Sequence, residues 1–329
     1  MRSLIIISND EIYINDNSIS SNYNDTINII DGLKNYFNIE ILSRKSSKKK
    51  AFSTKINKNI KFYIKSKKKN NIKVLMLSIT PLNILNFLIL SFHIKKLKLF
   101  TLLRSDGYKE YFLKYWWIGY FIYHLLYFVV KKKSKIMSVS KNLTNVSTNC
   151  IIEPSELDQS WFNRRKRVSK PKPKLLYLGR YRKEKGIFSV IKIFQSAKIN
   201  YDFTFAGDNI NLIKANKNIK VLEKINSQKK IIKLYDDNAI FILPSYTEGS
   251  PKVLKESLAR LRPVVIFEEI RHVKKKYFGV YICKRSINDL ERKIKFILNN
   301  YRSIQEKMKK NHLNTKKNFQ RNLLDALKY

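Results

Sequence analysis

Short runs of apolar, mostly β-branched residues alternate along this chain with longer stretches of helical periodicity. Two parallel strands need a crossover connection, usually a helix, so the alternation is typical of βα units. It predicts an α/β fold with doubly wound parallel sheets. The expected strands are residues 3–8, 39–42, 60–64, 73–77, 98–103, 135–139, 175–178, 201–206, 239–243 and 263–267. Residues 43–70 are expected to be a solvated loop that contains the short strand 60–64. The expected helices are residues 24–37, 186–197, 228–235, 251–260 and 287–299.

The segment NRRKRVSKPKPK, residues 163–174, separates the two halves of this pattern. Its charges and prolines disfavour both a helix and a central strand. A chain of 329 residues is long enough for two domains, each with its own core. We therefore expect a domain boundary between residues 165 and 166.

The chain is strongly basic, with 67 Lys and Arg against 25 Asp and Glu, a formal net charge of +42. Such an excess attracts phosphates, anionic lipid head groups or nucleic acid, although general enrichment in Lys, Asn and Ile explains part of it. The two cysteines, Cys150 and Cys283, exclude a disulfide framework and form no CxxC metal motif. The first apolar run is too short for a secretory signal. These features favour the cytoplasm.

One short motif places two glutamates around the expected start of a helix. In Glu248-Gly249-Ser250-Pro251, Ser250 suits the N-cap and Pro251 the first helical position. The helix would begin after a parallel strand, where its unpaired amides attract phosphate. Glu248 lies before the helix and Glu256 inside it, so each suits a sugar hydroxyl better than the anion. The motif is consistent with a nucleotide sugar, or simply with turn chemistry and a solvated helix face.

Four ordered motifs extend this pattern. They are YLGRYRKEKGI (residues 177–187), FTFAGDN (203–209), IKLYDDNAIFILPS (232–245) and EGSPKVLKE (248–256). Together they resemble the group 1 (family 4) glycosyltransferases. The resemblance implies a GT-B fold, in which two Rossmann-like doubly wound domains face a cleft. It also implies a retaining, metal-independent, hexosyltransferase-like enzyme that needs no cofactor beyond its nucleoside-diphosphate sugar donor.

The resemblance also assigns roles to residues of these motifs. Arg180 and Lys185 would hold the donor diphosphate, since cations stabilise a leaving group that gains negative charge. Glu248 would bind the transferred sugar, which makes Arg180, Lys185 and Glu248 the implied catalytic residues, and Glu256 would bind the ribose. Without their context, the two cations are simply two among 67. The implied donor-binding residues are Gly179, Gly249, Ser250, Pro251, Lys252, Val253 and Glu256.

The domains expected from the resemblance are an N-terminal acceptor-binding domain (residues 1–165), a nucleotide-sugar domain (166–310) and a C-terminal helix (311–329) that packs back on the first. The sequence departs from the family at Leu261, where glycine is usual because the helix C-terminus often requires positive φ. Leucine there would be strained by about 1 kcal/mol. The usual N-terminal glycine pair is also replaced, by residues 17–25. These departures leave open an inactive copy of the fold.

Two segments of the first half are candidates for other contacts. Arg104 and Asp106 follow an expected strand and would face the acceptor, with an ordinary strand-end turn as the alternative. Residues 115–133 form the most apolar segment, with Trp117 and its helical neighbours on one face; we expect a peripheral membrane contact, or else a core helix, rather than a span. The implied membrane residues are Trp116, Trp117, Lys131, Lys132 and Lys133, the lysines adding attraction to anionic lipid.

The sequence therefore favours a glycosyltransferase that acts at the cytoplasmic face of the cell membrane. Its partners would be a nucleotide sugar, a lipid-linked glycan acceptor and an anionic membrane surface, in the biosynthesis of surface polysaccharide. The alternative is a non-catalytic basic protein that binds membrane or nucleic acid on a degenerate transferase scaffold. No nucleic-acid reader motif is visible, so we expect no nucleic acid. A nucleotide-sugar epimerase or phosphorylase is a third possibility, which would need a different set of motifs.

Overall fold

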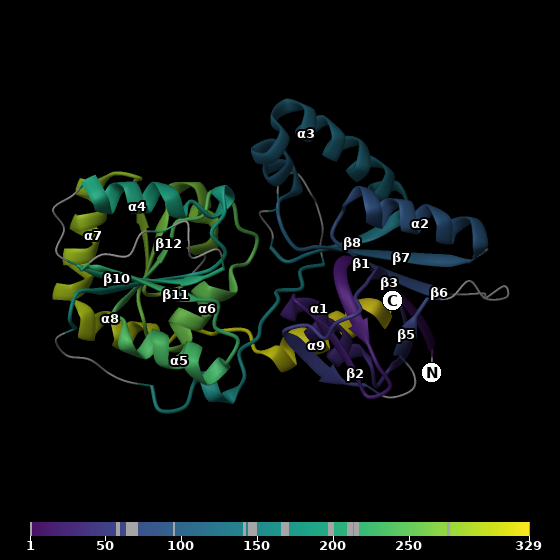
Figure 1. Ribbon diagram of the computed structural model, residues 1–329, viewed down its shortest axis with the longest axis horizontal. Helices are drawn as coiled ribbons and strands as arrows, with labels where there is room; N and C mark the ends of the chain where they lie inside the picture. The colour runs from purple at the N-terminus through teal and green to yellow at the C-terminus, as the bar shows by residue number, and fades with distance from the viewer. Residues whose placement is uncertain are drawn as a thin grey trace. The chain divides into compact units, whose positions relative to one another are not determined.

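The computed structural model divides the chain into two compact units, Met1–Glu156 with Thr315–Tyr329, and Leu157–Asn314 (Figure 1). Each unit has its own sheet and its own hydrophobic core. The structure describes residues 2–56, 60–63, 72–94, 96–140, 143, 150–165, 171–196, 201–208, 213, 217–274 and 277–328. Parts of the expected boundary segment 163–174 lie outside the described residues.

The first unit contains a sheet of eight described strands, centred on a long first strand. Six strands run parallel in the order β5, β3, β1, β6, β7, β8, and two antiparallel strands, β2 and β4, lie beside the end of β1. The bounds are β1 (Arg2–Ile14), β2 (Ser18–Ser21), β3 (Phe37–Lys45), β4 (Phe52–Lys55), β5 (Ile60–Phe62), β6 (Ile72–Leu77), β7 (Leu97–Leu103) and β8 (Ser134–Ser138). The prediction of a loop from residue 43 is wrong at its start, because β3 continues to Lys45 and β4 pairs with β2.

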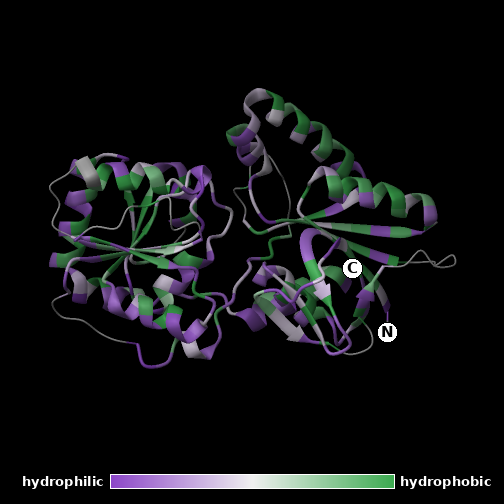
Figure 2. Cartoon of the chain, viewed as in Figure 1, coloured by the Kyte–Doolittle hydropathy of each residue, from purple (hydrophilic) through white to green (hydrophobic). Residues whose placement is uncertain are grey.

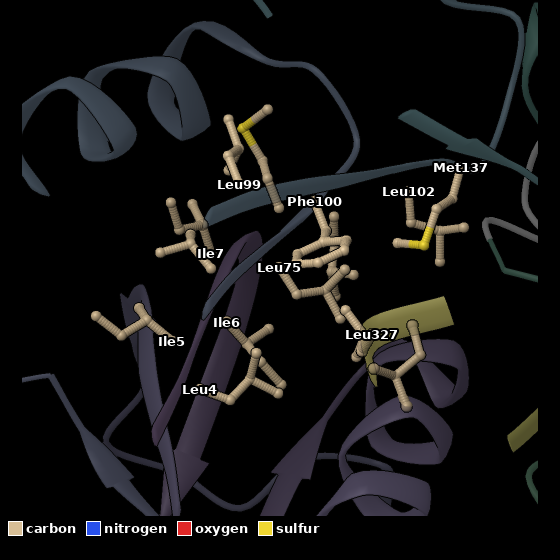
Figure 3. Packing of buried hydrophobic residues seen from close by; sticks show 14 of the residues in the cluster. Leu4, Ile5, Ile6, Ile7, Leu75, Leu99, Phe100, Leu102, Met137 and Leu327 are labelled. Atoms are coloured by element: carbon tan, nitrogen blue, oxygen red, sulfur yellow. The ribbon is translucent and has the colours of Figure 1, made fainter. Parts of the chain in front are cut away.

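Helices cover both faces of this sheet. Helices α1 (Asn24–Leu33) and α9 (Lys316–Lys328) lie on one face, and α2 (Pro81–His93) and α3 (Gly107–Lys133) lie on the other (Figure 1). The side chain of Leu327, on α9, is fully buried among residues of β1, β6 and β7 (Figure 3). The last helix of the chain is therefore part of the first unit's core.

Polar contacts fix α9 on α1. Gln320 donates a hydrogen bond from Nε2 to the backbone oxygen of Asn28 at 3.1 Å, and Lys316 pairs with Asp31 at 3.1 Å. Partial burial opposes ionisation of Asp31, but hydrogen bonds from Lys34, Thr54 and Lys316 outweigh it and hold the pKa of this carboxyl well below its usual value.

The apolar segment 115–133 contains the tip and the long arm of a helical hairpin formed by α3. Trp116 has φ 56° and ψ −143°, which breaks α3 into a short arm before it and a long arm after it. The arms pack closely, because a Cβ at Gly119 would overlap the backbone oxygen of Tyr111 and one at Gly107 would overlap the ring of Tyr123. Glycine at both positions therefore allows the fold-back.

The second unit has a six-stranded parallel sheet in the order β11, β10, β9, β12, β13, β14. From β9 the chain proceeds outward to β11 and then returns to place β12 on the other side of β9. The strands are β9 (Lys174–Leu178), β10 (Asp202–Gly207), β11 (Ile219–Glu223), β12 (Ile240–Leu243), β13 (Val264–Phe267) and β14 (Val280–Cys283). The helices are α4 (Ile187–Ser196), α5 (Gln228–Asp237), α6 (Lys252–Ala259), α7 (Ile287–Asn299) and α8 (Tyr301–Met308), with short 3-10 turns η1 (Gln159–Trp161), η2 (Lys183–Lys185) and η4 (Glu268–Lys274).

Helix α6 ends in a Schellman motif with leucine at the left-handed position. Leu261 has φ 57°, its N–H bonds to the oxygen of Leu258 at 3.0 Å, and the N–H of Arg262 bonds to the oxygen of Ser257 at 2.9 Å. The Leu261 side chain is 1% exposed. The strain expected at this position is thus present, and burial of the side chain accompanies it.

A buried ion pair ties α6 to the preceding helix. Arg260 donates two hydrogen bonds to Asp236, at 3.0 and 2.7 Å, and others to the backbone oxygens of Trp161, Asn163 and Arg164. Asp236 is thus the partner of a fully buried arginine.

Candidate functional site

The strand order of the second unit brings two loops together. β9 and β12 are parallel neighbours, although β10 and β11 come between them in sequence, so the order in which strands are added to the sheet reverses here, at a topological switch point. In open α/β sheets, ligands bind at the carboxyl ends of the strands at such a point. Residues 179–186 follow β9 and residues 244–251 follow β12, and these are the two segments that carry most of the predicted site.

Backbone contacts hold the two loops against each other. Gly186 has φ 64°, and a Cβ there would overlap the backbone oxygen of Pro244 in the other loop. The N–H of Tyr246 bonds to the oxygen of Glu184 at 2.9 Å. Gly186 is therefore required both for its left-handed backbone and for this close approach.

An ion pair connects the side chains of these loops. Lys185 Nζ lies 2.7 Å from Glu248 Oε1, and Ser245 Oγ donates to the same oxygen at 2.7 Å. The backbone oxygen of Glu248 lies 2.7 Å from His272 Nε2. The pair remains partly accessible to solvent. The structure thus brings together Lys185 and Glu248, two of the three predicted catalytic residues.

Arg180 lies in the same loop as Lys185. Its backbone oxygen accepts a hydrogen bond from Tyr177 Oη at 2.7 Å, and the next N–H, that of Tyr181, bonds to Asp208 Oδ1 at 3.2 Å. Among the described residues, no hydrogen bond or ion pair engages the half-buried guanidinium of Arg180. Gly179 is also close-packed, because a Cβ there would approach the Tyr177 hydroxyl.

The start of α6 differs from the prediction by one residue. The helix begins at Lys252, and Pro251 is the N-cap, with φ −68° and ψ 122°; Ser250 lies one position before it. Proline takes the N-cap with an extended ψ, so Ser250 cannot cap the first turn and the prediction was wrong there. In the described part of the chain, Ser250 Oγ is buried without a hydrogen-bond partner. The amides of Lys252 and Val253 belong to the first turn, which is the part of a helix that attracts anions.

Glu256 faces a neighbouring helix with at least one carboxylate oxygen. Oε2 accepts a hydrogen bond from the hydroxyl of Tyr235 on α5 at 3.1 Å, and the same hydroxyl lies 3.1 Å from the backbone oxygen of Val253. Complete burial, reinforced by the negative charge of Glu256, raises the pKa of Tyr235 well above its usual value, so the phenol stays protonated as a donor. Glu256 itself is largely buried.

The two acceptor-side candidates of the first unit, Arg104 and Asp106, make different contacts. Arg104 Nε donates to Ser78 Oγ at 3.0 Å, and its Nη1 lies 3.9 Å from Asp10, which accepts a short hydrogen bond from Thr26. Asp106 instead caps α3, accepting the N–H of Lys109 at 3.2 Å. For Asp106 the geometry is that of the turn alternative. Trp116, Trp117 and Lys131 to Lys133 are all exposed on α3.

Sequence reasoning missed an arginine that contacts the loop after β12. Arg285 donates to the backbone oxygen of Pro244 at 2.9 Å and to Ser189 Oγ at 2.7 Å, and pairs with Glu269 at 2.8 Å. Its guanidinium also lies over the ring of Tyr246, 4.2 Å from the centroid. Arg285 follows β14, a strand that was not predicted, so no motif drew attention to it. Among the described residues, no group of three or more His, Cys, Asp or Glu side chains could hold a metal ion.

Residues 159–315 match the family model described as glycosyl transferases group 1. Over these residues, slightly less than half of the chain, the sequence is similar to that family. No curated protein sequence matches the chain.

Solved structures similar to the whole chain have the same architecture. HepE of Anabaena, in complex with UDP and glucose, has a TM-score of 0.67 at 9% identity over 100% of both chains. WaaG, a glycosyltransferase involved in lipopolysaccharide biosynthesis, has a TM-score of 0.61 at 11% identity over 93% of this chain and 94% of its own. TarM has a TM-score of 0.55 at 14% identity over 78% of this chain, which spans about half (52%) of TarM. At these identities the likeness establishes the fold, and the predicted α/β, GT-B fold class is confirmed.

Proposed function

We propose that this chain is a retaining glycosyltransferase that uses a nucleoside-diphosphate sugar. The observation that carries the proposal is the Lys185–Glu248 pair. It joins the loop after β9, which also carries Arg180, to the loop after β12 that precedes α6. A cation, a carboxylate and helix amides at one switch point fit a ligand that joins a diphosphate to a sugar. The complexes of HepE with UDP and glucose support a uridine nucleotide as the first donor to try.

In this proposal the resting ion pair is exchanged when the donor binds. Lys185 would turn from Glu248 to the diphosphate, joined by the guanidinium of Arg180, and the two cations would offset the charge that develops on the leaving group. They supply positive charge from the protein, which is consistent with metal-independent hexosyl transfer. Glu248, held by Ser245, would then accept hydrogen bonds from sugar hydroxyls.

The remaining donor contacts follow from α6 and the loop before it. Gly249, Ser250 and the first-turn amides of Lys252 and Val253 would contact sugar and phosphate. Ser250 Oγ, buried without a described partner, is a polar atom that a ligand hydroxyl could satisfy. Glu256, which accepts a hydrogen bond from the Tyr235 hydroxyl, would bind the ribose.

We infer that the acceptor is a lipid-linked or polysaccharide glycan, bound through the first unit near Arg104, in surface polysaccharide biosynthesis at the inner face of the cell membrane. The role of WaaG in lipopolysaccharide biosynthesis supports this acceptor class. No cofactor is required in this scheme.

Calorimetric titration of the full chain with UDP-, GDP- and dTDP-sugars tests the donor site. Arg180→Ala and Lys185→Ala should each weaken donor binding about 10- to 100-fold, as expected for the loss of a hydrogen bond to a charged group. Lys183→Ala is the matched control, because it removes an exposed lysine from the same turn. Equal binding by the Lys183 and Lys185 variants would refute the site, and no binding of any nucleotide sugar would favour the non-catalytic alternative.

A further inference from the structure

The α3 hairpin presents an apolar surface to solvent although its inner face is well packed. Tyr108 on the short arm packs against Tyr123 and Tyr127 on the long arm, with ring centroids 4.8 and 5.9 Å apart. These tyrosines are buried. The hairpin therefore has its own aromatic interior, and the apolar residues outside it are surplus to its packing.

The long arm of α3 is hydrophobic over most of its length (Figure 2). Its exposed large side chains recur at helical spacing, which places them on one side of the helix. They are Trp117, Ile118, Phe121, Ile122, Leu125, Phe128 and Val129. Helix α2, which contacts α3, adds exposed Leu85, Ile89 and Phe92 at i, i+4 and i+7. Contiguous apolar surfaces on soluble proteins mark interaction sites.

The tip of the hairpin is both exposed and strained. Trp116 and Trp117 are 74% and 72% exposed, and Ile118 is 73% exposed. Trp116 occupies a backbone region that is almost restricted to glycine. A bulky indole in such a conformation destabilises the fold, and this one is mostly exposed to solvent. Stability alone therefore does not explain why a tryptophan occupies this position.

Lysines flank this apolar surface. Lys131, Lys132 and Lys133 end the long arm, all exposed, and Lys132 Nζ lies over the ring of Phe128, 4.2 Å from its centroid. Lys109 and Lys114 are exposed on the short arm. Aromatic side chains at the rim, aliphatic side chains between them and cations beside them are the composition of a helix that lies in the interface of an anionic bilayer.

We propose that the outer face of the α3 hairpin, with its Tyr115–Ile118 tip, inserts into the interface of an anionic membrane. This inference deepens the proposed function, on which it rests only for the idea that the acceptor is carried by lipid. Within the described residues, no helix is both long and apolar enough to cross a membrane. The long arm lies along the head groups, its apolar side chains enter the acyl boundary, and the lysines contact lipid phosphates.

Other occupants of this surface fit it less well. A second copy of the chain would bring like charge to like, since the formal net charge is +42. Nucleic acid would engage the lysines and aromatic rings but would leave Ile118, Ile122 and Leu125 in water. An anionic lipid surface satisfies both the cations and the aliphatic residues.

Trp116→Gly separates a membrane role from a structural one. Glycine accepts the backbone conformation at Trp116, so thermal stability should stay the same or rise, whereas loss of the indole should weaken vesicle partitioning roughly tenfold. The measurement is flotation of the full chain with phosphatidylcholine vesicles that contain phosphatidylglycerol. A Trp116→Gly variant that unfolds at lower temperature, or that floats like the parent, overturns the role of the tip.

Charge is tested by replacing Lys131, Lys132 and Lys133 with Gln. Flotation with the same vesicles should fall on the order of 100-fold, because each lysine near an anionic surface contributes about fivefold. The matched control replaces the exposed Lys229, Lys230 and Lys233 of α5 with Gln, which removes the same charge from the second unit and should change flotation little.

Three results would overturn the inference as a whole: equal flotation of the two triple variants, no flotation of the parent, or self-association of the parent that Trp116→Gly abolishes. Calorimetry with nucleotide sugars is run on the same samples without vesicles. If the chain floats but binds no nucleotide sugar, the membrane inference stands and the proposed function is refuted. If it binds a nucleotide sugar but does not float, the proposed function stands and the membrane inference is refuted.

Discussion

Replacing Leu261 with Gly and with Ala measures the backbone strain at the end of α6. Both substitutions remove the same buried side chain, which should cost about 2–5 kcal/mol of unfolding free energy in each case. They differ at the backbone, since alanine retains the left-handed penalty at φ 57° and glycine does not. After allowing for glycine's greater freedom in the unfolded chain, we expect Leu261→Gly to be more stable than Leu261→Ala by about 1 kcal/mol.

The expected order is the reverse of ordinary helix propensity, and the same helix supplies the control. Ala259 is the last residue of α6, where Ala259→Gly should destabilise by about 1 kcal/mol. The assay is equilibrium unfolding in urea followed by tryptophan fluorescence. The chain has three tryptophans, so with Trp116 and Trp117 changed to Phe, the buried Trp161 reports on the second unit alone. If Leu261→Ala is as stable as Leu261→Gly while Ala259→Gly is destabilised, the strain argument fails.

Three further predictions concern other fixed points of the two units. Asp236→Ala leaves Arg260 buried without its carboxylate and should lower the unfolding free energy by about 3–5 kcal/mol, measured by urea unfolding; a loss below 1 kcal/mol would mean that water reaches the guanidinium. Gly186→Ala adds a Cβ at φ 64° against the backbone of the opposite loop and should lower both stability and nucleotide-sugar affinity, measured by thermal unfolding and calorimetry. An unchanged affinity would contradict the idea that donor binding depends on the contact between the two loops. The folded-state pKa of Asp31 is depressed, so its contribution to stability is present above the unfolded pKa of about 4 and is lost as pH falls toward the folded value. Asp31→Asn should therefore reduce the loss of unfolding free energy at acid pH, measured by urea unfolding across pH. An unchanged loss would contradict the assigned contacts of Asp31 with Lys316 and its neighbours.

The parallel strands could be predicted because burial on both faces selects β-branched residues. One strand that was missed, β2, lacks this pattern. β2 has the sequence SISS and forms by pairing with β1 and β4, so its polarity gives no alternation to detect. Helix α2 is so uniformly apolar that no periodicity appears, although Thr80 caps it through the N–H of Asn83 and Pro81 starts it, which are readable signals.

The α3 hairpin could not be predicted from local sequence. Trp116 has no preference for positive φ, and the break there depends on contacts such as that between Gly119 and Tyr111 across the arms. The expected face with Trp117 and Phe121 does exist, and both residues are exposed on it. Periodicity thus identified the face, whereas tertiary contacts determined where the helix turns.

The meeting of Lys185 with Glu248 could be expected from motif order, because parallel strands place the loops after β9 and β12 at the same edge of the sheet. The hydrogen bonds of individual side chains could not. Tyr235 reaches Glu256 from a different helix, and Asp106 caps α3 because the chain turns directly after β7. Such details depend on helix positions that a strand and helix pattern does not define.

Two ion pairs of the second unit differ in the exposure of their side chains, and this difference distinguishes a structural pair from one that a ligand could open. Arg260 and Asp236 have side chains 2% and 10% exposed and share a bidentate geometry, so exchanging either partner for a ligand would strand a charge away from water. Lys185 and Glu248 are 21% and 13% exposed and meet through a single 2.7 Å contact. A pair with access to solvent contributes little net stability, and opening it costs correspondingly little. In the proposed mechanism, a diphosphate that offers Lys185 more than one negative oxygen would therefore displace Glu248, and Ser245 would hold the freed carboxylate where a sugar hydroxyl would bind.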